Sequence, residues 1–228
     1  MLHNISNYYT GGNMAPKVKF QKEQIIDAAL KIVRAKGIDA LTARETAAEL
    51  GVSTRPIFTW YETMERLKAD VRQAAKDIYL AYLEQGLKEP VPFLGIWHQY
   101  IRFAREEPEL YKLLYLTKSE AGSGGATEAL RYSQDLARPS VMRTYNIDAQ
   151  TADKYFRSIW LAAFSFAALI VTGDCSFSDE EIFDIGSEIS LSLCKAYKEV
   201  PGLADGTCDK DAVFRELVKK SAPKQEEK

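Results

Sequence analysis

The sequence of 228 residues predicts an all-α protein, with a small unit of three helices followed by a larger helical domain. Apolar residues recur at helical spacing along most of the chain. Residues 41–67 have the pattern of two short helices joined by a tight turn and followed by a longer helix. Residues 159–171 are apolar all round apart from Ser165, which is typical of a helix buried on several sides.

The composition is that of an ordinary soluble globular protein, with 46% hydrophobic and 27% charged residues. The three cysteines are unevenly spaced and odd in number, and no signal peptide precedes them, so we expect free thiols in a reducing cytoplasm. No apolar run reaches the roughly 20 residues of a membrane span.

The composition also suggests where the domains begin and end. Residues 1–16 lack periodicity, and we expect a disordered or tag-like segment with an alternative start at Met14. A basic arm built on Lys17, Lys19 and Lys22 is the other interpretation of this end. Residues 17–71 form the small helical unit, residues 72–220 the larger domain, and residues 221–228 a charged tail.

Two helices open the small unit. Apolar spacing predicts a helix over Phe20–Lys36, which Gly37 ends. A second helix is predicted over Ala43–Leu50, with Thr42 as its N-cap because a hydroxyl there can accept from first-turn amides.

A sharp turn and a third helix follow. Gly51 supplies the backbone freedom to leave the second helix, and Ser53 can cap a helix that begins at Thr54. Pro56 then falls in the first turn, where a missing N–H costs little. This is the layout of a helix-turn-helix, whose second helix lies in the DNA major groove. An ordinary αα-hairpin is the alternative.

The charge distribution favours the first interpretation to a modest degree. Residues 14–72 carry 11 Lys and Arg against 8 Asp and Glu, whereas the rest of the chain carries 19 against 24. A basic excess on the candidate reading unit is what attraction to phosphates requires.

Residues 22–67 resemble the N-terminal DNA-binding domain of the tetracycline-repressor (TetR) family of transcriptional regulators. The match spans about 50 residues without a gap. The residues that carry it are Ile26, Ala28, Ala29, Leu30, Gly37, Leu41, Thr42, Ala47, Leu50, Gly51, Val52, Ser53, Ile57, Phe58, Tyr61 and Leu67. Downstream, the resemblance is one of architecture, and it implies a helical ligand-binding and dimerisation domain.

The chain departs from the family pattern at two phosphate contacts. Phe58 stands where the family usually has Tyr, and Met64 and Glu65 stand close to where it usually has Lys. Trp60 stands where a His or a second aromatic residue is common. These departures bear on DNA affinity and leave the fold unaffected.

Seven residues of this unit are candidates for DNA contact. Arg55 is the better bidentate donor to a base, and Arg44 can reach a phosphate or a guanine edge. The two threonines at helix N-termini are placed for phosphates, and Thr59 for a thymine methyl. The full set is Thr42, Arg44, Thr54, Arg55, Phe58, Thr59 and Trp60.

A long helix connects the two domains. Its apolar spacing extends over Met64–Leu87, with Thr63 as N-cap, and Pro90 and Pro92 break the pattern after it. The domain boundary falls within this helix near Arg72. Such a rod can transmit a shift in one domain to the other.

Helices over Pro92–Glu106 and Pro108–Leu116 are dense in aromatic residues. They form either an aromatic-rich core or an apolar cavity, rimmed by Tyr hydroxyls, that holds a small ligand. The candidate ligand residues are Trp97, His98, Ile101, Tyr111, Tyr115, Trp160 and Phe164.

Residues 121–126 (AGSGGA) predict a flexible loop, without the flanking strand and Lys-Ser/Thr pair of a phosphate cradle. A helix is predicted over Thr127–Tyr145, and Pro139 is expected to kink or interrupt it.

Two long helices, Asp148–Thr172 and Ser178–Val200, are the candidate dimer face. Paired with the same helices of a second chain, they would make a four-helix bundle about a two-fold axis, and a wholly intramolecular core is the alternative. The candidate interface residues are Trp160, Phe166, Ile170, Ile182, Ile185, Ile189 and Leu193. A loop at 201–208 and a short amphipathic helix over Asp209–Lys220 complete the domain.

The sequence offers no catalytic constellation. Its two histidines, His3 and His98, lack a zinc-ligand spacing and a motif-placed nucleophile. We therefore expect no enzyme, no cofactor and no metal. The interpretation is a cytoplasmic, ligand-responsive, dimeric regulator, most simply a repressor, bound to a near-palindromic operator. The alternatives are a helical protein-interaction module and a DNA-binding regulator gated by a protein partner.

Overall fold

The computed structural model describes residues 21–117 and 124–221. The expectations for residues 1–16, for most of the 121–126 loop and for the charged tail after 221 lie outside these ranges. The elements are α1 (Lys22–Lys36), η1 (Ile38–Ala40), α2 (Ala43–Leu50), α3 (Arg55–Trp60), α4 (Met64–Gly86), α5 (Pro92–Glu106), α6 (Pro108–Tyr111), η2 (Lys112–Leu116), α7 (Ala126–Tyr145), α8 (Ala149–Thr172), α9 (Asp179–Glu199) and α10 (Lys210–Ser221).

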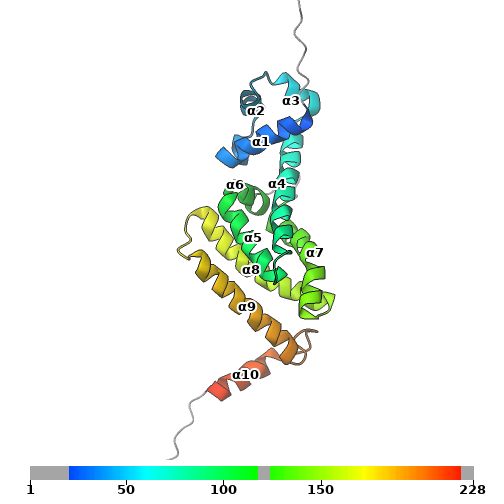
Figure 1. Cartoon of the computed structure of the whole chain (residues 1–228), viewed down its shortest axis with the longest axis vertical. Helices are drawn as coiled ribbons and strands as arrows, with labels where there is room; N and C mark the ends of the chain where they lie inside the picture. Colours follow the sequence, from blue (N-terminus) through cyan, green and yellow to red (C-terminus); the bar gives the residue numbers. More distant parts are fainter. Residues whose placement is uncertain (1–20, 118–123, 222–228) are drawn as a thin grey trace, which may run out of the picture.

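The molecule is elongated, with a small head at one end and a larger body beside it (Figure 1). The head consists of α1, α2, α3 and the first turns of α4. In the body α5 packs against the second half of α4, α7 and α8 pack against α5 and against each other, and α9 lies against α5 and α8. The amphipathic α10 leads away at the other end, with Phe214 and Val218 exposed.

The head contains its own part of the apolar core, which continues into the body. Ile25 and Val33 of α1 meet Ile57 of α3 and Leu67 of α4, and all four are fully buried. Ala47 of α2 is also buried, since only a small side chain lets α2 approach its neighbours closely. The core holds α2 and α3 in place from one side and leaves their other side to solvent.

Helix α4 lies in the cores of both parts. Leu67 and Val71 are buried on the head side, and Tyr79 and Leu83 are buried in the body. The rod predicted over Met64–Leu87 is therefore continuous from Met64 to Gly86, with Thr63 accepting a hydrogen bond from the amide of Arg66 at 3.4 Å.

The tightest packing of the body is the crossing of α4 and α5. A Cβ on Gly95 would lie 2.2 Å from the carbonyl oxygen of Gly86, and one on Gly86 would lie 2.4 Å from the carbonyl of Gly95. The two backbones are in contact, so both positions require glycine.

Two arginines join the head to the body. Arg34 of α1 donates twice to the Glu107 carboxylate, from Nε at 2.8 Å and from Nη2 at 2.7 Å. Arg72 of α4 donates to the carbonyl oxygens of Leu113 and Thr117. Bidentate pairs of this kind fix orientation as well as distance.

The structure differs from the predicted elements at three places. Helix α3 begins at Arg55, with Thr54 as its N-cap, so Ser53 lies outside the cap. The predicted helix Pro108–Leu116 ends in a π-helical turn, η2, where the Leu113 carbonyl takes donors from Arg72 and Thr117 rather than from the regular ladder alone.

The third difference concerns Pro139. Helix α7 is continuous from Ala126 to Tyr145 with Pro139 inside it, so the proline does not interrupt the helix. A proline removes one backbone bond of the ladder, and burial of Ala137, Ser140 and Val141 on both sides of it holds the helix together.

The glycine crossing yields a stability prediction. Alanine at position 95 favours a helix by about 0.5–1 kcal/mol over glycine. We nevertheless expect Gly95→Ala to lower the free energy of unfolding by about 1–3 kcal/mol or more, because its methyl group overlaps the α4 backbone. Urea unfolding of the purified protein measures the difference.

Glu84→Ala, an exposed position on α4, is the matched control and should change stability by less than about 0.5 kcal/mol. A Gly95→Ala protein as stable as the parent would contradict the close crossing.

Candidate functional site

The α2–turn–α3 unit is built by local capping and one glycine. The hydroxyl of Thr42 accepts from the amide of Glu45 at 3.2 Å, which caps α2 as predicted. Gly51 ends α2 in the left-handed conformation (φ 68°, ψ 31°), and the amide of Val52 donates back to Ala47 at 2.9 Å. The Thr54 side chain makes no capping bond to α3, so its hydroxyl is available to an outside acceptor.

All seven predicted DNA-contacting residues lie on the solvent side of this unit. Each of their side chains is exposed, while Ile57 beneath them is fully buried. Phe58 and Trp60 are each 51% exposed, so two large aromatic side chains form part of this solvent face. The seven are Thr42, Arg44, Thr54, Arg55, Phe58, Thr59 and Trp60.

The charges around the unit divide into paired and unpaired groups. Lys31 and Lys36 are paired with Glu49 and Glu45, at 3.5 and 2.8 Å. Arg44 and Arg55 form no ion pair with any residue of the described ranges. Two guanidinium groups thus face solvent with their donors uncommitted.

The hydroxyl of Thr59 has a role within its own helix. It donates to the carbonyl oxygen of Arg55 at 3.0 Å. The outward part of this side chain is therefore its methyl group, which suits an apolar contact.

A hollow beside Trp60 contains Lys22, which the basic-arm interpretation included, and Arg66, which the sequence interpretation did not single out. It measures about 250 Å³ and is lined by Lys22, Trp60, Tyr61, Glu62, Arg66 and Asp70. Lys22 pairs with Asp70 at 2.5 Å, and Tyr61 donates to the same carboxylate at 3.0 Å. Burial, with Asp70 nearby, raises the pKa of Tyr61 above its ordinary value.

Arg66 is the basic residue of this hollow without an ion pair among the described residues, and it is exposed, as is the acidic Glu62 beside it. It stands in the first turn of α4, where its amide donates to the hydroxyl of Thr63. Its position directly after the reading helix was the signal in the sequence that could have identified it.

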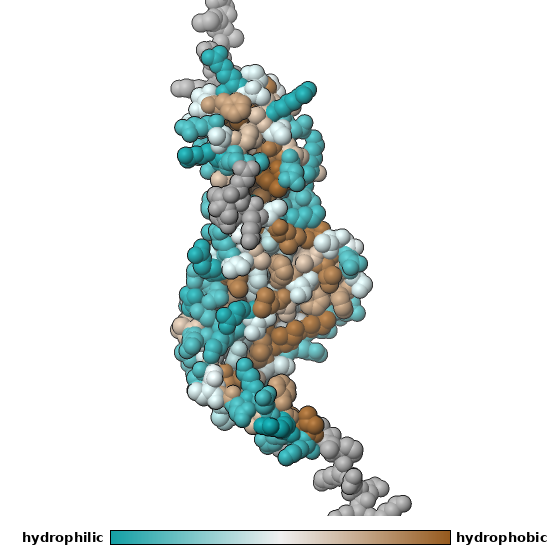
Figure 2. Space-filling model, turned by 180° about the vertical axis from the view of Figure 1, so that it is seen from behind, coloured by the Kyte–Doolittle hydropathy of each residue, from teal (hydrophilic) through white to brown (hydrophobic). Residues whose placement is uncertain are grey.

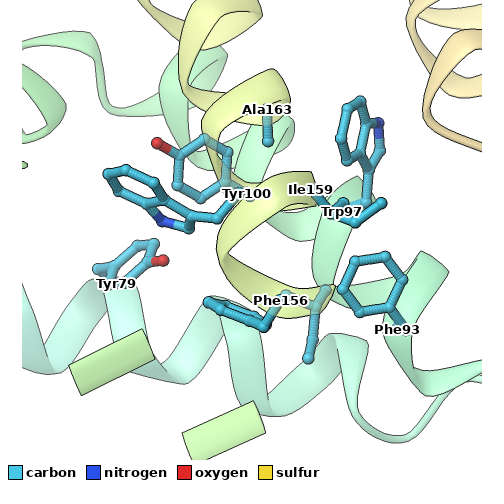
Figure 3. Close-up of a pocket in the computed structure, with 9 residues that line it drawn as sticks. Tyr79, Phe93, Trp97, Tyr100, Phe156, Ile159 and Ala163 are labelled. Carbon is cyan, nitrogen blue, oxygen red and sulfur yellow. The ribbon is translucent and has the colours of Figure 1, made fainter. Parts of the chain in front are cut away.

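The predicted ligand residues do not all line one cavity. A small cavity of about 20 Å³ lies among α4, α5 and α8 (Figure 3). Its lining comprises Tyr79, Phe93, Ile96, Trp97, Tyr100, Phe156, Ile159, Trp160 and Ala163. This volume admits about one water molecule. Two of the seven predicted residues, Trp97 and Trp160, belong to the lining.

A larger cleft of about 400 Å³ opens between α5 and the first half of α9. It is lined by Trp97, His98, Ile101, Arg102, Arg105, Glu106, Asp179, Ile182 and Phe183. Here His98 stacks on Phe183, with ring centroids 4.3 Å apart. Three of the predicted ligand residues therefore face this cleft, and Trp97 lines both spaces.

The remaining three predicted ligand residues lie outside both linings. Tyr111 and Tyr115 stack on each other at 4.3 Å in the core, and Phe164 stacks on Trp160 at 5.4 Å. The expected rim of Tyr hydroxyls is also used internally, since Tyr79 bonds Ser133 and Tyr100 bonds Tyr111.

The candidate dimer residues divide in a similar way. Trp160 and Ile182 are 6% and 1% exposed, so they are buried within their own chain and present almost no surface to a second one. The other five are half-buried on α8 and α9, namely Phe166, Ile170, Ile185, Ile189 and Leu193. Beside them Leu161 and Leu191 are 52% and 70% exposed.

Helix α8 is long and apolar enough to span a membrane by length and composition alone, which the apolar run by itself did not indicate. Only 39% of its most apolar window is buried within the chain. Figure 2 shows hydrophobic side chains gathered on the broad middle of the molecule, at the level of α8 and the start of α9. The part of the α8 surface that the rest of the chain leaves exposed is thus unusually apolar.

Within the described ranges no group of three His, Cys, Asp or Glu side chains could hold a metal ion. The three cysteines are free, as predicted. His3 lies outside the described residues.

Comparisons with known proteins agree on the fold. No family model matches the sequence. The chain is 25% identical over 166 residues to an uncharacterised HTH-type transcriptional regulator of Mycobacterium tuberculosis, covering 71% of this chain and 75% of that protein.

Two solved structures from Rhodococcus sp. RHA1 are similar. One is a TetR-like transcriptional regulator, with a TM-score of 0.56 and 13% identity over 74% of this chain and 92% of that one. The other, a protein of unknown function, has a TM-score of 0.63 and 18% identity over 80% and 98% of the two chains. The chain has the TetR-like fold, and the predicted fold class is confirmed.

Proposed function

We propose that this chain, whose fold is that of TetR-like regulators, is a dimeric repressor that binds a near-palindromic operator and is released by a small, mostly apolar effector. The observation that supports it best is the solvent face of α2 and α3, where seven polar and aromatic side chains stand exposed. Two of the seven are arginines that form no ion pair within the described ranges. Its setting is the cytoplasm, and it needs no catalytic group or cofactor.

In this proposal α3 lies in the major groove. Arg55 at its start donates to the edge of a base, and the methyl group of Thr59 contacts a thymine. Arg44 and the hydroxyls of Thr42 and Thr54 hold phosphates on either side. Phe58 and Trp60 pack against the sugars of the backbone.

Arg66 and the first amides of α4 replace the phosphate contacts that Phe58, Met64 and Glu65 do not offer. A helix N-terminus carries a partial positive charge and unpaired amides, which suit a phosphate. The adjoining hollow beside Trp60 is open to the same side.

Dimerisation uses the faces of α8 and α9 that their own chain leaves uncovered. Leu161, Leu191 and the half-buried residues beside them would pack against the same patch of a second chain in an isologous interface. This arrangement presents two copies of α3, roughly 34–36 Å apart, to successive major grooves.

Release follows if the effector binds better to a dimer whose heads are spaced wrongly for those grooves. The DNA affinity then falls only as far as the effector discriminates between the two arrangements. The small cavity of the body and the α5–α9 cleft are the spaces available to it.

The DNA contacts can be separated by a pair of variants. Arg55→Ala should cost about 1–3 kcal/mol of operator binding and relax the preference at one base pair, because it removes a base contact. Arg66→Ala should weaken binding to all duplexes alike and reduce the slope of log K against log salt by about 1. Fluorescence anisotropy over a salt series measures both.

Lys31→Ala, on the same head but paired with Glu49, is the control and should change neither quantity. If no duplex is bound at any salt concentration, the head is a protein-interaction module. If Arg55→Ala binds every duplex as tightly as the parent, α3 is not the reading helix.

The dimer surface is tested by placing the same negative charge at two exposed hydrophobic positions, one on the proposed interface and one away from it. Leu161→Asp should raise the dimer dissociation constant at least about 100-fold, because two buried carboxylates would face each other across the interface. Val91→Asp, at a similarly exposed hydrophobic site between α4 and α5, should leave it unchanged. Sedimentation equilibrium measures both constants.

Operator binding should fall with the dimer in Leu161→Asp and persist on a single half-site at reduced affinity. A Leu161→Asp protein that remains as tightly dimeric as the parent would exclude this face.

A further inference from the structure

Trp97 is the side chain common to the internal cavity and the α5–α9 cleft. The cavity lies on the α4 and α8 side of α5, and the cleft lies on its α9 side. The indole of Trp97 stands between them, with its ring edge-on to Phe166 of α8 at 6.2 Å. Against α9 it touches the backbone of Gly186, where an added Cβ would lie 2.4 Å from the ring. The ring is thus the wall between the two spaces.

The cavity lining contains two donors without acceptors. The indole N–H groups of Trp97 and Trp160 are buried, and neither has a hydrogen-bond partner among residues 21–117 and 124–221. In Figure 3 the nitrogen of Trp97 lies on the edge of its ring away from Tyr79 and Tyr100. Buried Trp N–H groups usually find a partner, and one left without it destabilises the protein. Each of these donors therefore lacks an acceptor, that of Trp97 on the edge of its ring away from the cavity tyrosines.

The charges near the cleft are balanced without a ligand. Arg105 pairs with Asp179 at 2.6 Å, and Arg102 pairs with Glu106 at 2.7 Å. His98 lies 3.3 Å from a carboxylate oxygen of Glu89. The cavity itself is lined only by aromatic and aliphatic residues. No uncompensated charge therefore calls for an ionised ligand.

We propose that Trp97 is a movable partition, and that the effector is an uncharged, flat molecule carrying hydrogen-bond acceptors such as a ketone, ester or lactone carbonyl. The effector enters through the α5–α9 cleft, displaces the indole ring and joins the two spaces into one site. The ring system of the effector replaces the aromatic contacts that the displaced indole of Trp97 gives up. The carbonyl of the effector accepts hydrogen bonds from the indole N–H groups. The inference rests on the proposed effector response and names the chemistry of that response.

The partition links the ligand to the candidate dimer face. Because the ring of Trp97 touches the α9 backbone at Gly186, it cannot swing towards α9 unless that helix shifts. Helix α9 also carries the half-buried Ile185 and Ile189 of the proposed interface. A ligand that holds Trp97 displaced thus favours one placement of α9 over another, which is the differential binding that a switch requires.

Three naphthalenes of one size test the ligand class. Acetylnaphthalene, ethylnaphthalene and naphthoate, all substituted at the same ring carbon, differ in offering a neutral acceptor, no acceptor and an anion. Calorimetry on the full-length protein should show acetylnaphthalene bound about 10-fold tighter than ethylnaphthalene, and naphthoate bound more weakly than acetylnaphthalene by at least the same factor.

Trp97→Phe keeps an aromatic ring but removes the donor. It should bring acetylnaphthalene close to the affinity of ethylnaphthalene while leaving ethylnaphthalene little changed. Trp60→Phe, in the head, should leave all three affinities unchanged. Equal binding of the acetyl and ethyl compounds, tightest binding of naphthoate, or no binding of any of them would overturn the assignment.

The partition itself is tested by association rates. Trp97→Ala should speed acetylnaphthalene association about 10-fold in stopped-flow measurements, because the wall is removed. Gly186→Ala should lower the affinity of the parent at least about 10-fold by pressing on the indole, and have little effect when combined with Trp97→Ala. An unchanged rate in Trp97→Ala would exclude the partition, and this variant decides the matter even if Gly186→Ala does not fold.

These measurements contain no DNA, so the two proposals fail separately. If the naphthalene affinities follow the predicted order but no operator is bound, the proposed ligand site stands and the proposed regulator function is excluded. Operator binding without the predicted order of naphthalene affinities would support the regulator and exclude the proposed ligand site.

Discussion

The structure depends on α4 being one uninterrupted helix that is buried at one end in the head and at the other end in the body. Leu67 and Val71 anchor its first half in the head, and Tyr79 and Leu83 anchor its second half in the body. Because both ends of α4 are closely packed, the helix cannot rotate within the head without also rotating within the body. The Arg34–Glu107 pair closes a second connection between the same two parts. The direction in which α3 points is therefore set by the packing of the body.

The sequence predicted the elements well because their signals are local. Thr42, Thr63, Asp148 and Ser178 cap α2, α4, α8 and α9 through their own side chains, and each lies where helical spacing begins. Pro139 does not interrupt α7, although interruption was one of the two predicted outcomes, since the cost of a lost backbone bond is local, whereas the burial that offsets it is tertiary. The π-turn of η2 depends on Arg72, which lies far away along the chain.

The sites were harder to predict than the helices. Exposure of the seven residues on α2 and α3 follows from a motif whose geometry is fixed by spacing. Periodicity identifies inward-facing aromatics, but it does not tell which of them leave a gap, so Tyr111 and Tyr115 were grouped with Trp97 although they fill the core. In the same way, apolar spacing does not separate Ile182, which is buried in its own chain, from its half-buried neighbours.

Helix α5 is the element on which both ends of the proposed switch act. Gly95 holds it against α4 by backbone contact, and the neighbouring Trp97 holds it against α9. The first contact is with α4, which extends into the head, and the second is with α9, which carries part of the candidate dimer face. Both are contacts with glycine, where no flexible side chain can absorb a small displacement. In the proposed dimer a shift of α5 at Trp97 would therefore be passed to α4 and α9 together, which would couple the spacing of the two heads to the state of one buried ring.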